Sequence, residues 1–146
     1  MNIKPTYVTF EQAKLLKEKQ FDEECSRFYV KPNCKLFGID EHGRYYPIKN
    51  KPKELWIVGN VAAQNVKNVI LAPEQSQVVE WLRIKHNIWV DVSIDQFSKP
   101  KNLQWMYSIV FLKDCTYSHS PKSYNSPQEA YSAAFDYILK KNDIKL

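Results

Sequence analysis

Three cysteines and three histidines are the side chains of this chain that could act as a nucleophile or bind a metal ion. Cys25, Cys34 and His42 follow one another in the first third of the chain, and Cys115 and His119 form a C-x3-H pair. Neither group has the paired Cys and His spacing of a structural zinc site. No local signature places a histidine beside a thiol as a catalytic base. We therefore predict no catalytic residues, no metal site and no cofactor.

Other enzyme signatures are equally scarce. Asp91 and Asp95 fit the solvent face of an alternating strand. General acid–base catalysis instead needs carboxyl groups in a cleft that shifts their pKa values. The three glycines, Gly38, Gly43 and Gly59, are too far apart for a phosphate-binding loop, a dinucleotide fingerprint or a nucleophile elbow. The sequence thus favours a protein that is not an enzyme, and an enzyme of unrecognised type stays open as the second alternative.

Basic and aromatic residues gather in residues 44–56. The whole chain has a net charge of +5, and residues 1–53 hold 11 Lys and Arg against 7 Asp and Glu, a difference of +4. Lysines neutralise phosphates, and exposed aromatic rings stack on bases. The predicted nucleic-acid-binding residues are Arg44, Tyr45, Tyr46, Lys49, Lys51, Lys53 and Trp56. The same residues could instead be strand packing beside a solvated loop, so nucleic acid is the second choice of partner.

Aromatic residues also suit a protein partner, which is the first choice. Four Trp and nine Tyr exceed what a small core easily buries, and both residue types are favoured anchors of protein interfaces. Tyr117 and Tyr124 fall in residues 114–125, a polar segment that is typical of a loop. We predict these two tyrosines as a partner-binding surface. The sequence leaves open whether the chain is a monomer or a homodimer.

The elements that must position these side chains begin with a helix that leads directly into a strand. Pro73 suits the first turn of this helix, Val78 and Leu82 share its apolar face, and Asn87 suits a left-handed position at its end. From Ile88 the apolar pattern changes to period two, which predicts a strand.

Capping signals open two further helices. Thr9 with Gln12 forms one capping box, and Ser126, Pro127 and Glu129 form the start of the last helix. Strands are predicted at residues 27–30, 35–39, 44–48, 55–58, 88–94 and 104–113. The last of these strands is apolar on both faces, which predicts a central strand that is buried on both sides.

These elements predict an α+β class in helix–hairpin–helix–hairpin–helix order, with a mainly antiparallel sheet and three helices packed on it. The length of 146 residues fits a single domain, residues 1–146. The chain shows no apolar leader and no apolar run of the roughly 18 residues that span a bilayer. An odd number of cysteines without a leader is typical of a reducing compartment. We expect a cytoplasmic protein without a membrane segment.

Three segments resemble small uncharacterised proteins that phages and mobile elements of Bacteroides-type bacteria carry. They read TFEQAKLLKEKQFDEEC, APEQSQVVEWLRIKHNIWV and SPQEAYSAAFDYIL. The residues that carry the resemblance are Glu11, Gln12, Ala13, Phe21, Cys25, Ala72, Pro73, Gln77, Val78, Trp81, Leu82, Glu129 and Ala130. The resemblance implies a setting and no activity. We therefore expect an accessory binding protein whose partner is a host or phage protein.

Overall fold

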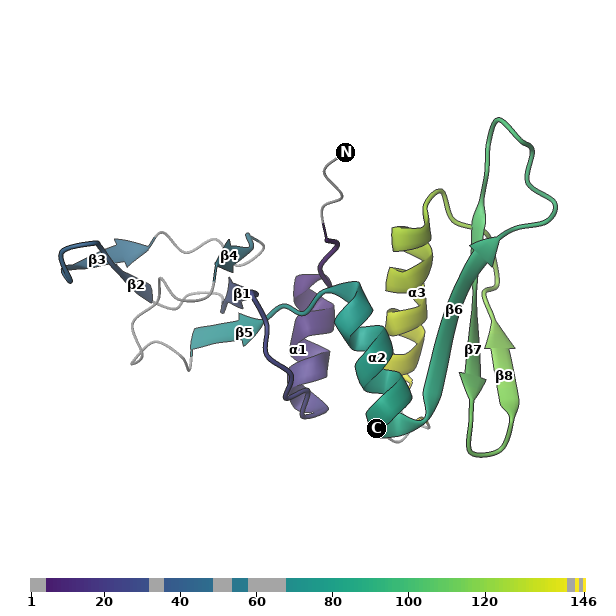
Figure 1. The fold of residues 1–146 in the computed structure, drawn as a ribbon, viewed down its shortest axis with the longest axis horizontal. Helices are drawn as coiled ribbons and strands as arrows, with labels where there is room; N and C mark the ends of the chain where they lie inside the picture. The colour runs from purple at the N-terminus through teal and green to yellow at the C-terminus, as the bar shows by residue number, and fades with distance from the viewer. Residues whose placement is uncertain (1–4, 32–35, 49–53, 58–67, 142–143, 145) are drawn as a thin grey trace. The chain divides into compact units, whose positions relative to one another are not determined.

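The chain folds into two compact units. The computed structural model describes residues 5–31, 36–48, 54–57, 68–141, 144 and 146 (Figure 1). The first unit spans residues 7–73, and the second combines residues 1–6 with residues 74–146. The single domain predicted for residues 1–146 stays a prediction.

Helix α1 (Phe10–Glu18) opens the first unit, as its capping residues predict. The Thr9 hydroxyl accepts the Gln12 N–H at 3.2 Å, and the Gln12 side chain accepts the Thr9 N–H at 3.1 Å. Each bond satisfies a backbone donor at the end of the helix, where no helical partner exists. The helix buries Gln12, Ala13 and Leu16, so a capping residue also belongs to the core.

The sheet of the first unit has the strand order β4–β1–β5, and both pairs are antiparallel. Its strands are β1 (Arg27–Val30), β4 (Trp56–Ile57) and β5 (Val69–Leu71). Phe28 and Val30 of β1 are buried, and Trp56 and Val69 pack against them. The core of this sheet therefore centres on β1.

β2 (Leu36–Ile39) and β3 (Tyr45–Ile48) form the predicted hairpin, which is a separate two-stranded sheet. Its turn contains Gly43 at φ +76°, a conformation that residues with a side chain rarely adopt. The Asp40 carboxylate accepts the backbone N–H groups of His42 and Arg44, each at 2.9 Å. These bonds fix the turn from inside.

The second unit begins with α2 (Gln75–His86) and β6 (Ile88–Ile94). The helix begins two residues after Pro73, because Glu74 is the N-cap and the Gln77 side chain accepts its N–H at 2.9 Å. Asn87 ends the helix at φ 56° and ψ 40°, the predicted left-handed conformation. The passage from helix directly into strand is confirmed.

The sheet of the second unit is an antiparallel meander in the order β6–β7–β8. The elements that complete this unit are β7 (Trp105–Phe111), β8 (Thr116–His119) and α3 (Pro127–Lys140). Helices α2 and α3 lie on the same side of this sheet (Figure 1). The core between helices and sheet includes Val78, Leu82, Ile109, Phe135 and Ile138, each 0 % exposed.

α3 begins at the predicted capping residues, and one of its predicted capping hydrogen bonds has a different partner. Ser126 accepts the Glu129 N–H at 3.1 Å, and Pro127 takes the first helical position. The Glu129 carboxylate accepts the N–H of Asn125 at 3.1 Å, rather than that of the N-cap residue. The carboxylate still lies in the first turn, where the helix dipole favours a negative charge.

The α+β class with antiparallel sheets is confirmed, but the predicted order of single hairpins between helices is not found. In the described part of the chain between α1 and α2 there are five strands. Within the described residues, three separate sheets stand in place of one sheet covered by three helices. Strands that follow one another in sequence lie side by side in a sheet in about two-thirds of cases. β1 is an exception, because its partners are β4 and β5 rather than β2.

Two predictions about the last strands need correction. Residues 114–125, predicted as a loop, contain β8, whose side chains are polar on both faces and so hide the strand pattern. β7 is central, as predicted, but only one of its faces is buried against helices. Met106 and Val110 on the other face are half-buried, and Leu112 is exposed beyond the end of the strand.

Candidate partner surface

The sheet of the second unit has a face that its helices do not cover, and we call it the outer face. Alternation along β6 creates it: Ile88 and Val90 are 3 % and 2 % exposed on the helix side, whereas Trp89 between them is 43 % exposed. The strand register extends this face across β7 and β8. The outer face consists of Trp89, Asp91, Ser93, Met106, Ser108, Val110, Tyr117 and His119.

Two rows of side chains cross all three strands of the outer face, and Ser93 pairs with Met106 across β6 and β7 alone. In the first row Trp89 pairs with Val110, and Val110 pairs with Tyr117, which is 69 % exposed. Paired residues on one face of an antiparallel sheet have their Cβ atoms about 5 Å apart, so this row forms a continuous apolar and aromatic strip. The second row is polar and consists of Asp91, Ser108 and His119.

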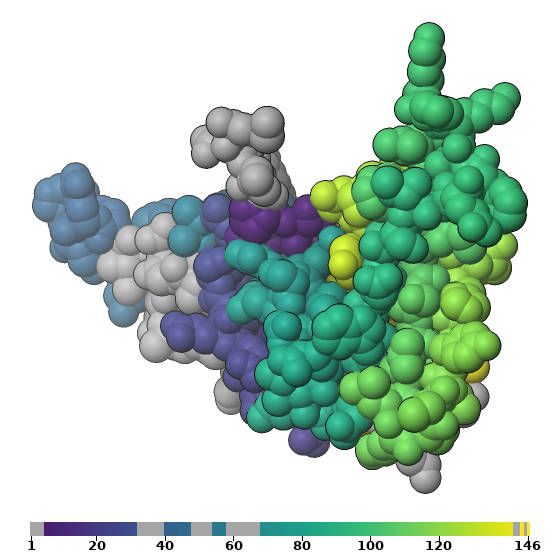
Figure 2. Space-filling view, turned by 45° about the vertical axis from the view of Figure 1, so that its right-hand side comes forward, coloured from purple at the N-terminus to yellow at the C-terminus, as the bar shows by residue number. Residues whose placement is uncertain are grey.

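The two rows meet at the β8 end of the outer face. The rings of Tyr117 and His119 lie edge to face, with centroids 5.1 Å apart and planes at 62°. In Figure 2 the strands of this sheet, coloured green, lie at the surface of the view. The outer face is therefore a surface with an aromatic row beside a polar row.

The second predicted partner residue, Tyr124, does not belong to the outer face. Its ring stacks on Tyr107, a buried residue of the helix side, at 6.1 Å between centroids. Its backbone N–H donates to the Trp105 carbonyl, and its carbonyl accepts the Trp105 N–H, both at 2.8 Å. Burial and the nearby Asp136 charge raise the pKa of the Tyr124 hydroxyl. Tyr117 and Tyr124 thus lie on opposite sides of the sheet.

The structure describes four of the seven predicted nucleic-acid-binding residues. Lys49, Lys51 and Lys53 lie outside the described residues. Arg44 is exposed, and its Nε donates to the Asp40 carboxylate at 2.9 Å. The hydrogen bonds from Arg44 and from the His42 N–H lower the pKa of Asp40. Asp40 therefore stays negatively charged and holds Arg44 within the hairpin.

The three aromatic members of the same set differ in exposure. Tyr45 is 59 % exposed and Tyr46 is 43 % exposed. As neighbours in a strand they point to opposite faces, so a single ligand strand could stack on one of them. Trp56 pairs with Phe28 in the sheet and packs on the core of the first unit. Its indole Nε1 is buried and has no hydrogen-bond partner among the described residues.

Cys25, the buried cysteine of the described residues, is not an activated thiol. Cys25 is buried, and burial together with the charge of Glu23 raises its pKa to about 11. Its Sγ donates to the Glu23 carbonyl at 3.4 Å, and a thiol with this pKa is protonated at neutral pH. Cys115 is exposed in the turn between β7 and β8 at φ 57°, and Cys34 lies outside the described residues. Among the residues described, no three His, Cys, Asp or Glu side chains come together as a metal site.

A cavity of about 430 Å³ lies beside the first turns of α2 and α3, a feature that the sequence did not indicate. Its lining includes Pro5, Glu74, Val79, Glu80 and Tyr131. Burial and the nearby Asp91 charge raise the pKa of the Tyr131 hydroxyl. Both carboxylates already have structural partners, because Glu74 caps α2 and Glu80 pairs with Arg83 at 2.7 Å. The outer face is therefore the stronger candidate for binding.

Comparison of the chain with protein-family models, with curated proteins and with solved structures gives no match. Within the described residues, none of the helices combines the length and the apolar character that crossing a membrane requires.

Proposed function

We propose that the chain is a non-enzymatic binding protein and that its outer face binds a protein partner. The observation that carries this proposal is the pair of exposed aromatic side chains, Trp89 and Tyr117, in one cross-strand row. Trp and Tyr are the residues most often found as anchors of protein interfaces. Both sit on strands of a packed sheet, so little ordering entropy opposes binding.

The composition of the outer face suits a partner that binds reversibly. Obligate interfaces resemble a domain core cut in half, whereas reversible ones combine a few apolar anchors with a polar rim. The outer face has one apolar and aromatic row, and beside it Asp91, Ser108 and His119 offer hydrogen-bonding groups. A partner with an apolar ridge flanked by polar groups would complement these two rows.

The setting of this function is also a proposal. The resemblance of three segments to small proteins of phages and mobile elements of Bacteroides-type bacteria supports an accessory role in the bacterial cytoplasm. A host or phage protein would then be the partner. Nucleic acid binding through the surface around residues 44–56 is the alternative, and the exposure of Tyr45 supports it.

Affinity capture with matched variants tests the main proposal. The tagged wild type is compared with the double variant Trp89→Ser, Tyr117→Ser in extracts of a Bacteroides-type host. The control is Ile84→Ser, because Ile84 is 62 % exposed on α2, away from the outer face. We expect the wild type and the control to capture the same protein. The double variant should bind this protein about a thousandfold more weakly, since each of its two lost anchors contributes about 2 kcal/mol.

Two results would contradict this proposal. One is a captured protein that the double variant and the wild type bind with equal affinity. The other is the absence of any protein whose capture depends on Trp89 and Tyr117. Circular dichroism of each variant confirms that its fold is intact, which the exposure of both side chains predicts.

A further inference from the structure

The loop between β6 and β7 is a second candidate surface, distinct from the outer face. Its own hydrogen bonds hold it in shape. The Asp95 N–H donates to the Gln104 carbonyl at 2.8 Å and closes the ladder at the base of the loop. The Asp95 carboxylate accepts the Phe97 N–H at 3.0 Å and a bond from the Ser123 hydroxyl. The loop is therefore anchored to the segment that precedes α3.

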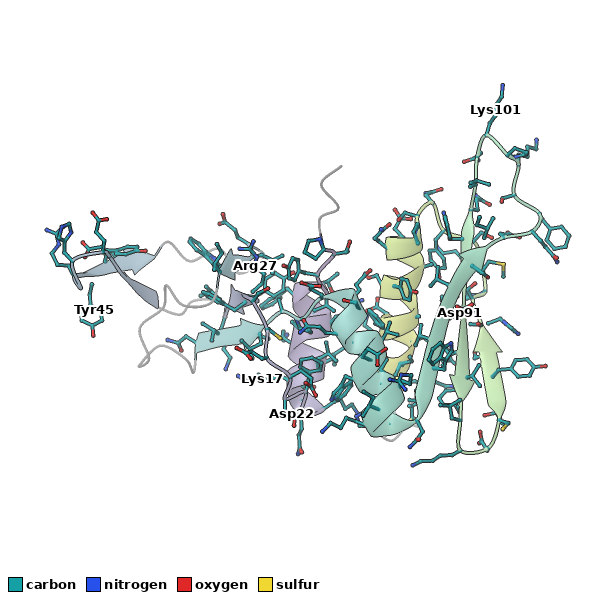
Figure 3. The ribbon with its side chains drawn as sticks, viewed as in Figure 1. Lys17, Asp22, Arg27, Tyr45, Asp91 and Lys101 are labelled. Carbon is teal, nitrogen blue, oxygen red and sulfur yellow. The ribbon has the colours of Figure 1, made fainter. Side chains whose placement is uncertain are left out.

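Two consecutive turns make up this loop. In the first, the Ser98 N–H donates to the Asp95 carbonyl at 2.9 Å; in the second, the Asn102 N–H donates to the Lys99 carbonyl at 2.8 Å. Pro100 takes the second position of the second turn, where its fixed φ favours the turn. Phe97 and Lys101 both take the third position of their turns. Each is thus presented outward by a closed turn, and Figure 3 shows Lys101 at the tip of the hairpin.

The exposed side chains of this loop combine an aromatic ring with positive charge. Phe97 is 85 % exposed, the largest value among the exposed large hydrophobic residues described. Lys99 and Lys101 follow Phe97 by two and four residues and are exposed, and neither forms an ion pair among the described residues. Lys122 adds a third charge: its Nζ lies 5.5 Å from the centre of the Tyr124 ring, and the Tyr124 backbone bridges Trp105 at the base of the loop.

Asp95 is the one acidic side chain within this loop. Hydrogen bonds from the Ser123 hydroxyl and the Phe97 N–H lower its pKa. One of its carboxylate oxygens accepts a bond within the loop, and the other accepts a bond from Ser123 of the segment before α3. Lys99, Lys101 and Lys122 are therefore exposed near two carboxylates that already have partners: Asp95 is hydrogen-bonded, and Asp136 near Tyr124 is paired with Lys140 at 3.1 Å. This charge distribution complements an anionic partner.

We propose that the β6–β7 loop binds single-stranded nucleic acid, with Phe97 stacking on an unpaired base and Lys99, Lys101 and Lys122 contacting phosphates. Exposed aromatic rings combined with positive charge bind single strands without sequence preference. A duplex offers no free base face to the ring. An anionic membrane fits less well, because Gln96, Asn102 and Gln104 of the same loop carry amide groups that are costly to bury in hydrocarbon.

Fluorescence anisotropy with a labelled single-stranded oligothymidine tests this proposal on the full chain. We expect Phe97→Ala to weaken binding roughly tenfold, because stacking on one base contributes that order of affinity. The double variant Lys99→Gln, Lys101→Gln should lower the slope of log affinity against log salt by about 1.4, since each neutralised phosphate contributes about 0.7.

Matched controls come from the turn between β7 and β8, at the opposite end of the same sheet. Leu112 is 46 % exposed there and Lys113 is exposed, so Leu112→Ala and Lys113→Gln remove the same kinds of group. Both control variants should bind the oligonucleotide as the wild type does. The outer-face variant Trp89→Ser, Tyr117→Ser should also bind it normally, which separates this site from the proposed protein-binding function.

Three results would overturn the proposal. The first is the absence of oligonucleotide binding at low salt. The second is binding that Phe97→Ala and the lysine variant leave unchanged. The third is sedimentation of the chain with phosphatidylserine vesicles, lost in Phe97→Ala, without binding to the oligonucleotide, because the loop would then be a membrane contact.

Discussion

Neighbouring residues on β6 and near β8 show how finely the candidate surface depends on side-chain direction. Trp89 and Val90 are adjacent in sequence, yet they are 43 % and 2 % exposed. Tyr117 and Tyr124 come from the same polar segment, but Tyr117 is exposed and Tyr124 stacks on Tyr107. The first difference follows from the period of two along a strand. The second arises because Tyr124 lies outside β8 and bridges Trp105, whereas Tyr117 belongs to β8. The exposed member of each pair is the one that we assign to binding.

His86 makes the stability of the second unit depend on pH. Its ring meets the Trp81 ring edge-on, 4.3 Å between centroids, and burial with the nearby Lys113 charge lowers its pKa below 6.5. As pH falls, the unfolded chain binds the proton first. Stability should therefore be full above about pH 6.5 and decrease as pH falls from there toward the folded pKa. Urea unfolding midpoints across this range measure the effect.

The variant His86→Gln isolates this contribution. Its unfolding midpoint should change less than that of the wild type between about pH 7 and pH 5, because the titrating group is gone. Asp95 and Asp114 do not interfere, since hydrogen bonds hold their pKa values below 3.8. Equal pH dependence in the variant and the wild type would show that His86 does not contribute.

At the scale of elements, the sequence predicts those whose local chemistry is complete. The Thr9–Gln12 capping box and the Asn87 helix end each depend on a few neighbouring residues, and each is found as predicted. β8 escaped prediction because Thr116 to His119 have no apolar alternation and only the pairing with β7 makes them a strand. Pairing between distant strands depends on tertiary packing, which a local pattern does not contain.

The Ser126 cap of α3 provides a test at the same scale. Its hydroxyl accepts the Glu129 N–H at 3.1 Å, and α3 buries Phe135 and Ile138 against the sheet. We expect Ser126→Ala to reduce the free energy of unfolding by about 1 kcal/mol, the usual effect of losing an N-cap. Urea unfolding measures this change.

Ser126→Asn is the matched control for this cap. Asparagine caps helices about as well as serine does, so the stability of this variant should stay close to that of the wild type. If the alanine and asparagine variants are equally stable, the hydroxyl bond has no role in holding α3.

At the scale of the whole molecule, the second unit presents two different surfaces. The outer face combines aromatic anchors with a polar row, and the β6–β7 loop combines one exposed ring with lysines. The sequence predicted the α+β class and one residue of the outer face, Tyr117. It did not identify Trp89, because only the register of β6, β7 and β8 shows that Trp89 shares a row with Tyr117. The division of the surface thus follows from strand pairing.

Photo-crosslinking from the outer face tests the central claim most directly. Tyr117→p-benzoylphenylalanine places the reactive group in the aromatic row, and Ile84→p-benzoylphenylalanine places it on α2 with similar exposure. We predict that irradiation in the host links position 117, but not position 84, to one partner protein of defined mass, and that adding Trp89→Ser removes this product. Products that are the same from both positions, or none from position 117, would contradict the claim that the outer face binds a partner.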